Sequence, residues 1–221
     1  MKPRTIVIGD IHGCLQALDA ILAAIRPQPN DTLVTVGDYV DRGPDSKGVI
    51  ERLLSLREQV HLVPLLGNHE EMMLDALEKR IEPFGWLNHG GAQTLESYGF
   101  TGDTNVVPET HLEFLRNLQT YFENDTHFVV HANYDPRLPL AEQPTELLRW
   151  VKLTERMPGP HVSGKIAVVG HTHDRQGEIL KLPHLICLDT YCYGGRWLTA
   201  MDLDSQMVWQ ATREGELVTS S

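Results

Sequence analysis

Four short segments place glycine beside aspartate, asparagine and histidine, each directly after a run of aliphatic residues. They are GDIHG at residues 9–13, GDYVDRG at 37–43, GNHE at 67–70 and GHTH at 170–173. The runs before them, residues 5–8, 32–36, 60–66 and 166–169, predict buried strands. Because the carboxyl ends of strands in an open α/β sheet converge on one crevice, these polar residues can meet at one point. The pattern predicts an α/β fold with a polar site at the strand ends.

Helical periodicity fills the intervals between these strands. Apolar residues recur about every 3.6 positions in residues 15–25 and 49–56, and residues 70–79 are expected to continue as a helix from GNHE. Two apolar runs around Asp204 and Ser205 predict a β-hairpin over 197–211, and residues 213–221 are expected to fray. We therefore expect a mixed α/β chain.

One catalytic domain over residues 1–221 is expected, because a chain of this length can bury a full core. The least regular part is residues 81–107, which are rich in Gly and Asn and are predicted to form a small helical insertion that caps the active face. Within it, Trp86 can belong either to the packed core or to a substrate rim formed with residues 88–91.

The residue types in the motifs indicate a site for two metal ions. Asp10 and His12 are two positions apart, so in an extended segment both side chains point the same way and can bind one ion together. The two carboxylate oxygens of Asp38 can bridge two ions. Because no cysteine belongs to the set, Mn, Fe or Zn is favoured over a structural zinc site. Amide and imidazole ligands for the second ion are Asn68, His131 and His171.

The order GDxHG, GDxVDRG, GNHE, an isolated histidine after a strand, and GHT resembles the metallophosphoesterase superfamily. Within it, the motifs resemble the PPP-type serine/threonine phosphatases of the bacteriophage lambda and bacterial branch, over residues 5–201. The resemblance implies the calcineurin-like fold, a central β-sandwich flanked by helices. It also implies two divalent ions, Mn foremost with Fe or Zn as alternatives. The implied ligands are Asp10, His12 and Asp38 for the first ion, and Asp38, Asn68, His131 and His171 for the second.

The same resemblance implies a catalytic group beside the metals. Arg42 would bind phosphate, since a guanidinium fork matches two phosphoryl oxygens. His69 would be the general acid, oriented by Asp41, and would give a proton to the leaving group. The expected reaction is direct attack of a metal-bridging hydroxide on phosphorus.

Three positions depart from the family pattern. His173, the second histidine of GHTH, is a further candidate metal ligand. For the second phosphate-binding residue, Lys152 is nearest in register and Arg149 is the alternative. Tyr191 stands where the family usually has glycine, so it either lines the substrate pocket or is a packed aromatic side chain.

Composition limits the partners and the compartment. The net charge of −11 argues against nucleic acid and against an anionic membrane surface, because both need clustered Lys and Arg. The chain begins with only a four-residue apolar run, so no signal peptide or membrane span is expected. Three cysteines are too few for a disulfide framework and favour a reducing cytoplasm.

The function predicted from the sequence is hydrolysis of phosphate monoesters, foremost phosphoserine and phosphothreonine in proteins, with small phosphate esters as further substrates. One alternative is symmetrical hydrolysis of dinucleoside tetraphosphates, whose enzymes share these motifs. Another is a metal-bearing binding protein without turnover. Retention of His69 and Arg42 argues against this last class.

Overall fold

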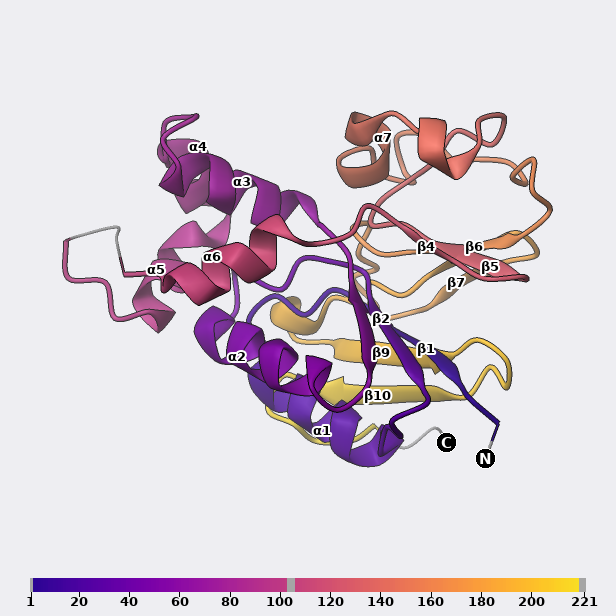
Figure 1. The fold of residues 1–221 in the computed structure, drawn as a ribbon, viewed down its shortest axis with the longest axis horizontal. Coiled ribbons are helices and arrows are strands. Elements are labelled where there is room, and N and C mark those ends of the chain that lie inside the picture. Colours follow the sequence, from indigo (N-terminus) through magenta and orange to yellow (C-terminus); the bar gives the residue numbers. More distant parts are fainter. Residues whose placement is uncertain (1, 103–105, 219–221) are drawn as a thin grey trace.

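Two five-stranded sheets form the centre of the molecule (Figure 1) in the computed structural model, which describes residues 2–102 and 106–218. The first sheet has the order β10–β9–β1–β2–β3, with β1 at Thr5–Ile8, β2 at Thr32–Thr35, β3 at His61–Pro64, β9 at Trp197–Asp202 and β10 at Val208–Thr212. The second has the order β4–β5–β6–β8–β7, with β4 at Phe122–Glu123, β5 at His127–Val129, β6 at Ile166–Val169, β7 at Leu180–Leu182 and β8 at Leu185–Cys187.

Strand direction explains where the polar motifs lie. In the first sheet β1, β2 and β3 are parallel, with Val7 opposite Val34 and Val34 opposite Val63. In the second sheet β5, β6 and β8 are parallel. The carboxyl ends of each parallel set therefore lie at one edge, and the motif residues begin just beyond those ends.

The two sheets pack face to face around a core of branched aliphatic side chains. Such side chains suit the pleated surface of a sheet, and their burial supplies most of the driving force for joining the two layers. The buried members of this core are Val7, Val34, Val36, Val63, Leu65, Val129, Val168, Ile186, Leu188, Met201 and Leu203. The predicted β-sandwich flanked by helices is confirmed.

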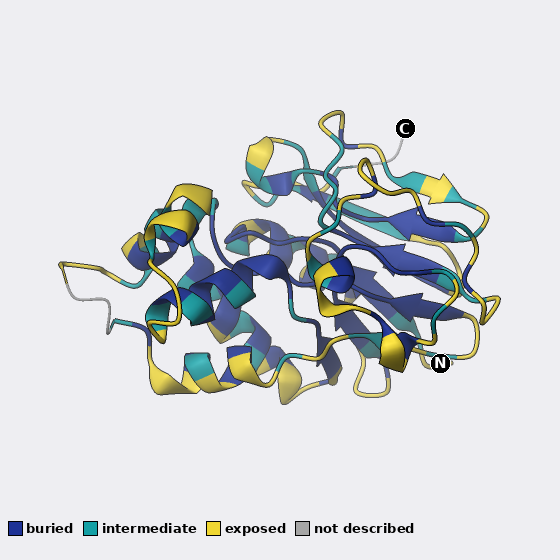
Figure 2. Cartoon of the chain, turned by 90° about the horizontal axis from the view of Figure 1, so that it is seen from above, coloured by how far each residue is buried: buried dark blue, intermediate teal, exposed yellow. Residues whose placement is uncertain are grey.

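The outer faces of the two sheets are covered differently (Figure 1). Helices α1 (Leu15–Ile25), α2 (Ser46–Arg57), α3 (Asn68–Leu77) and α6 (Glu109–Arg116) share one buried cluster with the first sheet. The second sheet is covered by a mostly irregular segment that includes a 3-10 turn at Leu140–Glu142 and helix α7 at Thr145–Arg149. Figure 2 shows mostly buried strands in the right half of the view, and helices at the left that are buried on one side and exposed on the other.

The predicted insertion forms helix α4 (Phe84–Trp86), a π-helical turn η1 (Leu87–Gly91) and helix α5 (Ala92–Ser97). Trp86 is 1% exposed and belongs to the helix-side core, which supports the packing alternative rather than the rim. Whether the insertion acts as a cap stays a prediction.

The sequence located the strands well but was wrong about the chain end. The hairpin of β9 and β10 is confirmed. Residues 213–218 do not fray, because the chain turns back and Val218 N–H donates to Gln210 O at 2.8 Å, beside a bridge between Leu217 and Ala211. Residues 219–221 lie outside the described residues.

The remaining helical turn, η3, is at Cys192–Gly194. Among the described residues, no helix has the length and apolar character needed to cross a membrane.

Candidate metal centre

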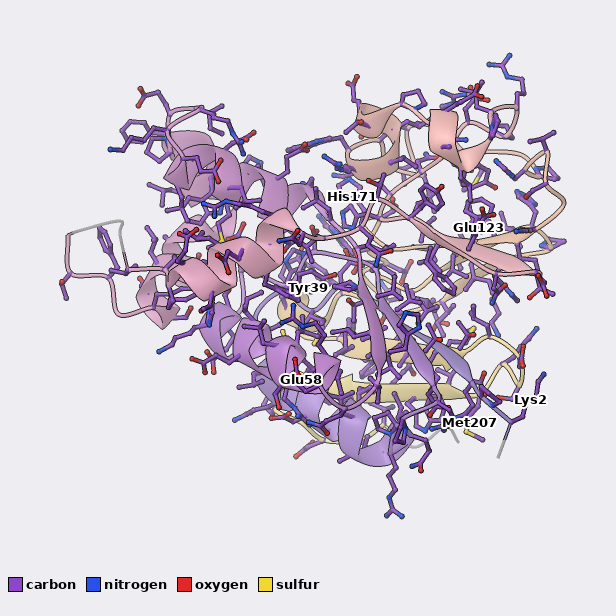
Figure 3. All side chains as sticks on the ribbon, viewed as in Figure 1. Lys2, Tyr39, Glu58, Glu123, His171 and Met207 are labelled. Atoms are coloured by element: carbon purple, nitrogen blue, oxygen red, sulfur yellow. The ribbon has the colours of Figure 1, made fainter. Side chains whose placement is uncertain are left out.

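The strand ends bring the predicted ligands together. Asp10 and His12 follow β1, and Asp38 follows β2. His131 follows β5, and all four side chains are at most 4% exposed. Figure 3 shows His171, which follows β6, between the region of α3 and the region of α7.

Asp38 occupies the middle of this arrangement. Its Oδ2 lies 3.3 Å from Nε2 of His12, and its Oδ1 lies 3.4 Å from Nε2 of His131. Among the described residues, two groups of candidate ligands share this carboxylate: His12, Asp38 and His69, and Asp38, His131 and His171. Each carboxylate oxygen thus faces a different group, which matches the predicted bridging position.

Backbone carbonyls orient the imidazole rings. Nδ1–H of His12 donates to Val40 O at 2.9 Å, and Nδ1–H of His131 donates to Val36 O at 2.9 Å. Since the proton is on Nδ1, Nε2 presents a lone pair toward Asp38 in both residues. Metal-ligating histidines use this arrangement, in which the second ring nitrogen is tied to a fixed acceptor.

Several acceptor atoms face one another without a hydrogen between them. Nε2 of His131 lies 3.1 Å from Oδ1 of Asn68 and 3.4 Å from Oδ1 of Asp38. Oδ2 of Asp10 accepts from His171 N–H at 2.9 Å, whereas its buried Oδ1 has no partner among the described residues. Converging, unpartnered oxygen and nitrogen acceptors are what a divalent cation satisfies, so the residues fit a metal centre.

Burial and neighbouring charges shift the pKa values of several of these groups. Burial lowers the pKa of His131, and it lowers the pKa of His171 to about 3, so both imidazoles are neutral at pH 7 and can offer lone pairs. Burial opposes ionisation of Asp38, but the neighbouring His131 and His69 imidazoles hold its pKa well below the usual range. Burial raises the pKa of Asp10, and the nearby carboxylate of Asp189 adds to the shift.

The sequence assigned no role to Glu70, but its side chain holds the backbone of the segment that contains Asp38. The buried carboxylate accepts from four backbone N–H groups, those of Asp38 at 2.8 Å, Tyr39 at 2.7 Å, Val40 at 3.2 Å and Gly67 at 3.1 Å. Glutamate at the third position of a helix can accept from the N-cap N–H, here that of Gly67, which is the glutamate half of a capping box, and this position was the sequence signal for Glu70.

Unusual backbone conformations concentrate at this edge of the molecule. Nine described residues other than glycine have positive φ, and six of them lie in the site segments: His12, Asp38, Asp41, Arg42, His171 and Tyr191. Non-glycine residues in this region are uncommon, and the surrounding structure must hold them there. Such a cluster is typical of a functional site.

His69 and Asp41 form a buried pair next to Asp38. Nδ1–H of His69 donates to Oδ2 of Asp41 at 2.7 Å, and Nε2 of His69 lies 3.9 Å from Oδ2 of Asp38. Burial raises the pKa of Asp41 to about 7 and lowers the pKa of His69 well below its ordinary value. The ring therefore presents Nε2 toward the ligand groups while Asp41 holds its other side.

Arg42 lies at the border between the ligand groups and a surface cavity. Its Nη1 donates to Nε2 of His12 at 3.0 Å, and its guanidinium lies 4.6 Å from the centre of the Tyr193 ring. The cavity, about 610 Å³, is lined by Arg42, Tyr193 and polar residues of the insertion, including Asn88 and His89. The insertion thus lines this cavity through residues 88–89, and its role as a substrate rim stays a prediction.

The two candidates for the second phosphate-binding residue, Arg149 and Lys152, have different surroundings in the structure. Nη1 of Arg149 donates to Oε1 of Glu71 at 2.6 Å, so its charge is already paired. Lys152 is exposed, and its charge contributes to the lowered pKa values of His171 and His173.

His173 and Tyr191 contact each other rather than the ligand groups. Their rings stack with centroids 4.4 Å apart and planes inclined by 17°. His173 belongs to neither of the two groups of candidate ligands among the described residues, so its role as a ligand stays a prediction.

The chain resembles known phosphoesterases. It is 34% identical over 132 residues to serine/threonine-protein phosphatase 1 of Salmonella typhimurium, which is 58% of each chain. It is 46% identical over 70 residues to a symmetrical bis(5'-nucleosyl)-tetraphosphatase of Acidovorax, covering 31% of this chain and 24% of the relative. These matches span less than two thirds of either relative. A crystal structure of a putative diadenosine tetraphosphatase superposes with a TM-score of 0.72 and 26% identity, covering 96% of this chain and 94% of that one.

The family model for calcineurin-like phosphoesterases matches residues 3–175, which include every candidate ligand described above. The two-sheet sandwich and the strand-end site agree with this match. The chain therefore belongs to the calcineurin-like phosphoesterase family and is a metallophosphoesterase.

Proposed function

We propose that the chain is a phosphomonoesterase that acts foremost on phosphoserine and phosphothreonine in proteins. The observation that carries the proposal is the position of Asp38, whose two oxygens face two different groups of ligands. When bound, two ions would activate water and polarise the phosphoryl oxygens. The residues proposed to hold the ions are Asp10, His12 and Asp38 for the first, and Asp38, Asn68, His131 and His171 for the second.

The remaining groups have roles that follow from their positions. Arg42 adjoins both the ligand groups and the cavity, so its guanidinium can bind phosphoryl oxygens at the point where substrate enters. His69 would give a proton from Nε2 to the leaving oxygen, because its Nδ1 is already held by Asp41, and the charge of Asp41 would have to offset the burial that lowers the pKa of His69. Asp41 would stabilise the positive charge on the ring.

The small number of basic residues near the site favours a substrate with one phosphoryl group over a polyphosphate. Arg42 contacts His12, Lys152 and Arg175 carry charges that help to lower the pKa of His173, and Arg149 is paired with Glu71. A tetraphosphate calls for several convergent cations, and the chain as a whole carries a net charge of −11. The similarity to a serine/threonine-protein phosphatase supports the same choice.

Hydrolysis of dinucleoside tetraphosphates is the second candidate. It is favoured by the 46% identity to a tetraphosphatase over 70 residues, and by the similarity to the solved structure of a putative diadenosine tetraphosphatase over 96% of the chain. A binding protein without turnover is less compatible, because His69 and Arg42 are both retained, His69 is hydrogen-bonded to Asp41, and Arg42 contacts His12.

Manganese is the proposed ion, with Fe or Zn as alternatives, since the donor atoms are nitrogen and oxygen. The three cysteines are buried and free, which supports a reducing cytoplasm as the proposed compartment.

A substrate panel tests the proposal. Metal-free protein is reloaded with Mn, Fe, Zn or Mg and assayed with phosphopeptides, an alkyl phosphate, an aryl phosphate, a phosphodiester and diadenosine tetraphosphate. We expect kcat/KM to be highest for phosphopeptides or simple monoesters, and Arg42→Ala to lower kcat/KM for all substrates. A preference of about tenfold or more for the tetraphosphate, equal to about 1.4 kcal/mol, would replace the first candidate by the second.

A further inference from the structure

The carboxylate of Asp41 is held by more than its histidine. Nε1–H of Trp86 lies 3.0 Å from Oδ1 and 3.1 Å from Oδ2, and Oγ1–H of Thr94 donates to Oδ1 at 2.7 Å. With the 2.7 Å bond from His69, three donors from three different elements meet on one carboxylate that is completely buried. A buried carboxylate with this many donors is fixed in orientation.

Both additional donors come from the insertion, 45 and 53 residues after Asp41. Thr94 holds the backbone as well, because its Oγ1 accepts from Asp41 N–H at 2.8 Å while donating to the side chain. Oγ of Ser46 lies 3.0 Å from the same hydroxyl and completes its hydrogen bonding. The side chain and main chain of Asp41 are thus held by one threonine.

The segment that these contacts hold has an uncommon conformation. Asp41 and Arg42 have φ values of 72° and 69°, in the left-handed region that side-chain-bearing residues rarely adopt. Arg42 N–H also donates to Gly90 O at 3.3 Å, so the insertion contacts the second residue of the pair directly. Residues in such conformations persist where their surroundings fix them.

Two glycines permit the close approach. A Cβ built on Gly90 would lie 2.5 Å from Arg42 N, and one on Gly91 would lie 2.5 Å from the Trp86 ring. Gly90 also has a φ of 113°, which favours glycine. The π-helical turn η1 therefore lets the insertion press against the Asp41–Arg42 segment without steric conflict.

We propose that Trp86 and Thr94 are positioning residues for the reaction. They fix the Asp41 carboxylate so that Oδ2 holds the His69 ring in the orientation that delivers a proton from Nε2. This inference rests on the proposed function, specifically on His69 as the general acid. A merely structural role, in which Trp86 fills the helix-side core, predicts different results for the variants below.

The first test compares substrates that need a proton with substrates that do not. Trp86→Phe removes the N–H and keeps an aromatic ring, and Thr94→Val removes the hydroxyl and keeps the shape. We expect each variant to lose about 10- to 100-fold in kcat toward an alkyl phosphate, as for other groups that orient a reacting side chain. KM and metal content should stay unchanged, and an aryl phosphate should lose less because its leaving group needs little protonation.

Two controls match these changes. Thr94→Ser keeps the hydroxyl and should restore kcat. Trp209→Phe makes the same indole-to-phenyl change at β10, where the ring packs against the same core cluster without contacting Asp41, and should keep the wild-type ratio of alkyl to aryl rates. Equal losses on both substrates in Trp86→Phe and Thr94→Val, or losses of less than twofold on both, would overturn the proposal.

A second readout needs no activity. In the metal-free chain, the ¹⁵N-labelled indole N–H of Trp86 should resonate at a shifted position that moves in Asp41→Asn but not in Trp209→Phe. An indole signal unaffected by Asp41→Asn would contradict the contact and overturn the proposal. If Trp86→Phe does not fold, the Thr94→Val and Thr94→Ser pair decides the kinetic test.

The variant His69→Asn separates this inference from the function on which it rests. Loss of the alkyl rate in His69→Asn together with wild-type behaviour in Trp86→Phe and Thr94→Val would reject the positioning role and keep the acid. The absence of any leaving-group dependence in His69→Asn would reject the acid role in the proposed function, and the positioning role with it.

Discussion

The site has two halves that are built in different ways. The metal half consists of side chains that lie just beyond strand ends of both sheets, and all of them except His131 belong to a short motif. The acid half, Asp41 with His69 and Arg42, depends on an insertion whose contacting residues lie about 50 positions later in the chain. The comparison shows that the strand ends of the sandwich are enough to position the metal ligands. The residues proposed to deliver a proton are held in addition by contacts from the insertion.

The two halves should therefore fail in different ways. Changes in the metal half should alter metal content and activity together, because the ligands share Asp38. Changes in the acid half should leave the metals bound and lower kcat selectively, because the contacts to Asp41 involve none of the proposed ligands.

The largest expected effect is that of Asp38→Asn. The change removes a negative charge that faces both groups of ligands, so metal content and activity should fall together. Two-metal sites supply several kcal/mol of transition-state stabilisation, so we expect a loss of about 10³-fold or more in kcat/KM. Elemental analysis and a phosphate-release assay measure the two quantities. A fully active variant with two ions bound would remove Asp38 from the metal half.

The next effect is that of His69→Asn in the acid half. Metal content should stay at the wild-type level, while kcat toward alkyl phosphates falls by about 10² to 10⁴. Aryl phosphates should be affected less, since their leaving groups need less help from a proton. His69 also belongs to one of the two groups of candidate ligands, so it could be a metal ligand instead of an acid. Loss of metal in this variant would show that it is a ligand.

Glu70→Gln tests the support of the metal half. The amide group would point an N–H₂ at backbone donors that now share a carboxylate. We expect the metal affinity to fall about 10- to 100-fold, as for other groups that orient ligands. The free energy of unfolding should fall by about 1 to 3 kcal/mol. Isothermal titration and urea denaturation measure both, and an unchanged metal affinity would show that the Asp38 turn is held without Glu70.

The smallest effect is expected at the other end of the first sheet, away from both halves. Burial alone would raise the pKa of Asp31, but hydrogen bonds from Arg4 and Gln28 lower it. A lowered pKa in the folded state stabilises the fold above the unfolded value near 4, and this stabilisation is lost as the pH falls through the folded pKa. Asp31→Asn should cost about 1 to 3 kcal/mol at pH 7 and progressively less below about pH 4.

Activity and metal content serve as the control for Asp31→Asn. Both should stay within twofold of the wild type per folded molecule, because Asp31 precedes β2 whereas Asp38 follows it. A stability deficit that grows on acidification would contradict the assignment of a lowered pKa to Asp31.

The metal half was predictable from sequence because its information is local. An aliphatic run fixes each strand, and a ligand such as Asp10 or Asp38 follows within three residues, so strand ends and ligands are found together. Glu70 was missed because its role depends on the main chain of the Asp38 segment, some 30 residues away. Its place at the third position of the helix, from which glutamate can accept from the N-cap N–H, was the available signal.

The acid half could be predicted only in part. Asp41, Arg42 and His69 lie in motifs, but the contact between Trp86 and Asp41 is fixed by the folding of an insertion that has no regular periodicity. Two further contacts likewise depend on tertiary packing between separate segments of the chain. They are the ion pair between Arg149 and Glu71 and the stacking of Tyr191 on His173. Spacing in the sequence carries no information about such pairs.

Counting the ions that activity requires is the most direct test of the central claim. Metal-free protein is titrated with Mn²⁺ while bound metal and aryl phosphate hydrolysis are followed in the same sample. The account predicts binding of two ions per chain, with activity that rises in step with the second ion and disappears reversibly on chelation. Full activity in metal-free protein, or saturation of activity with a single bound ion, would contradict it.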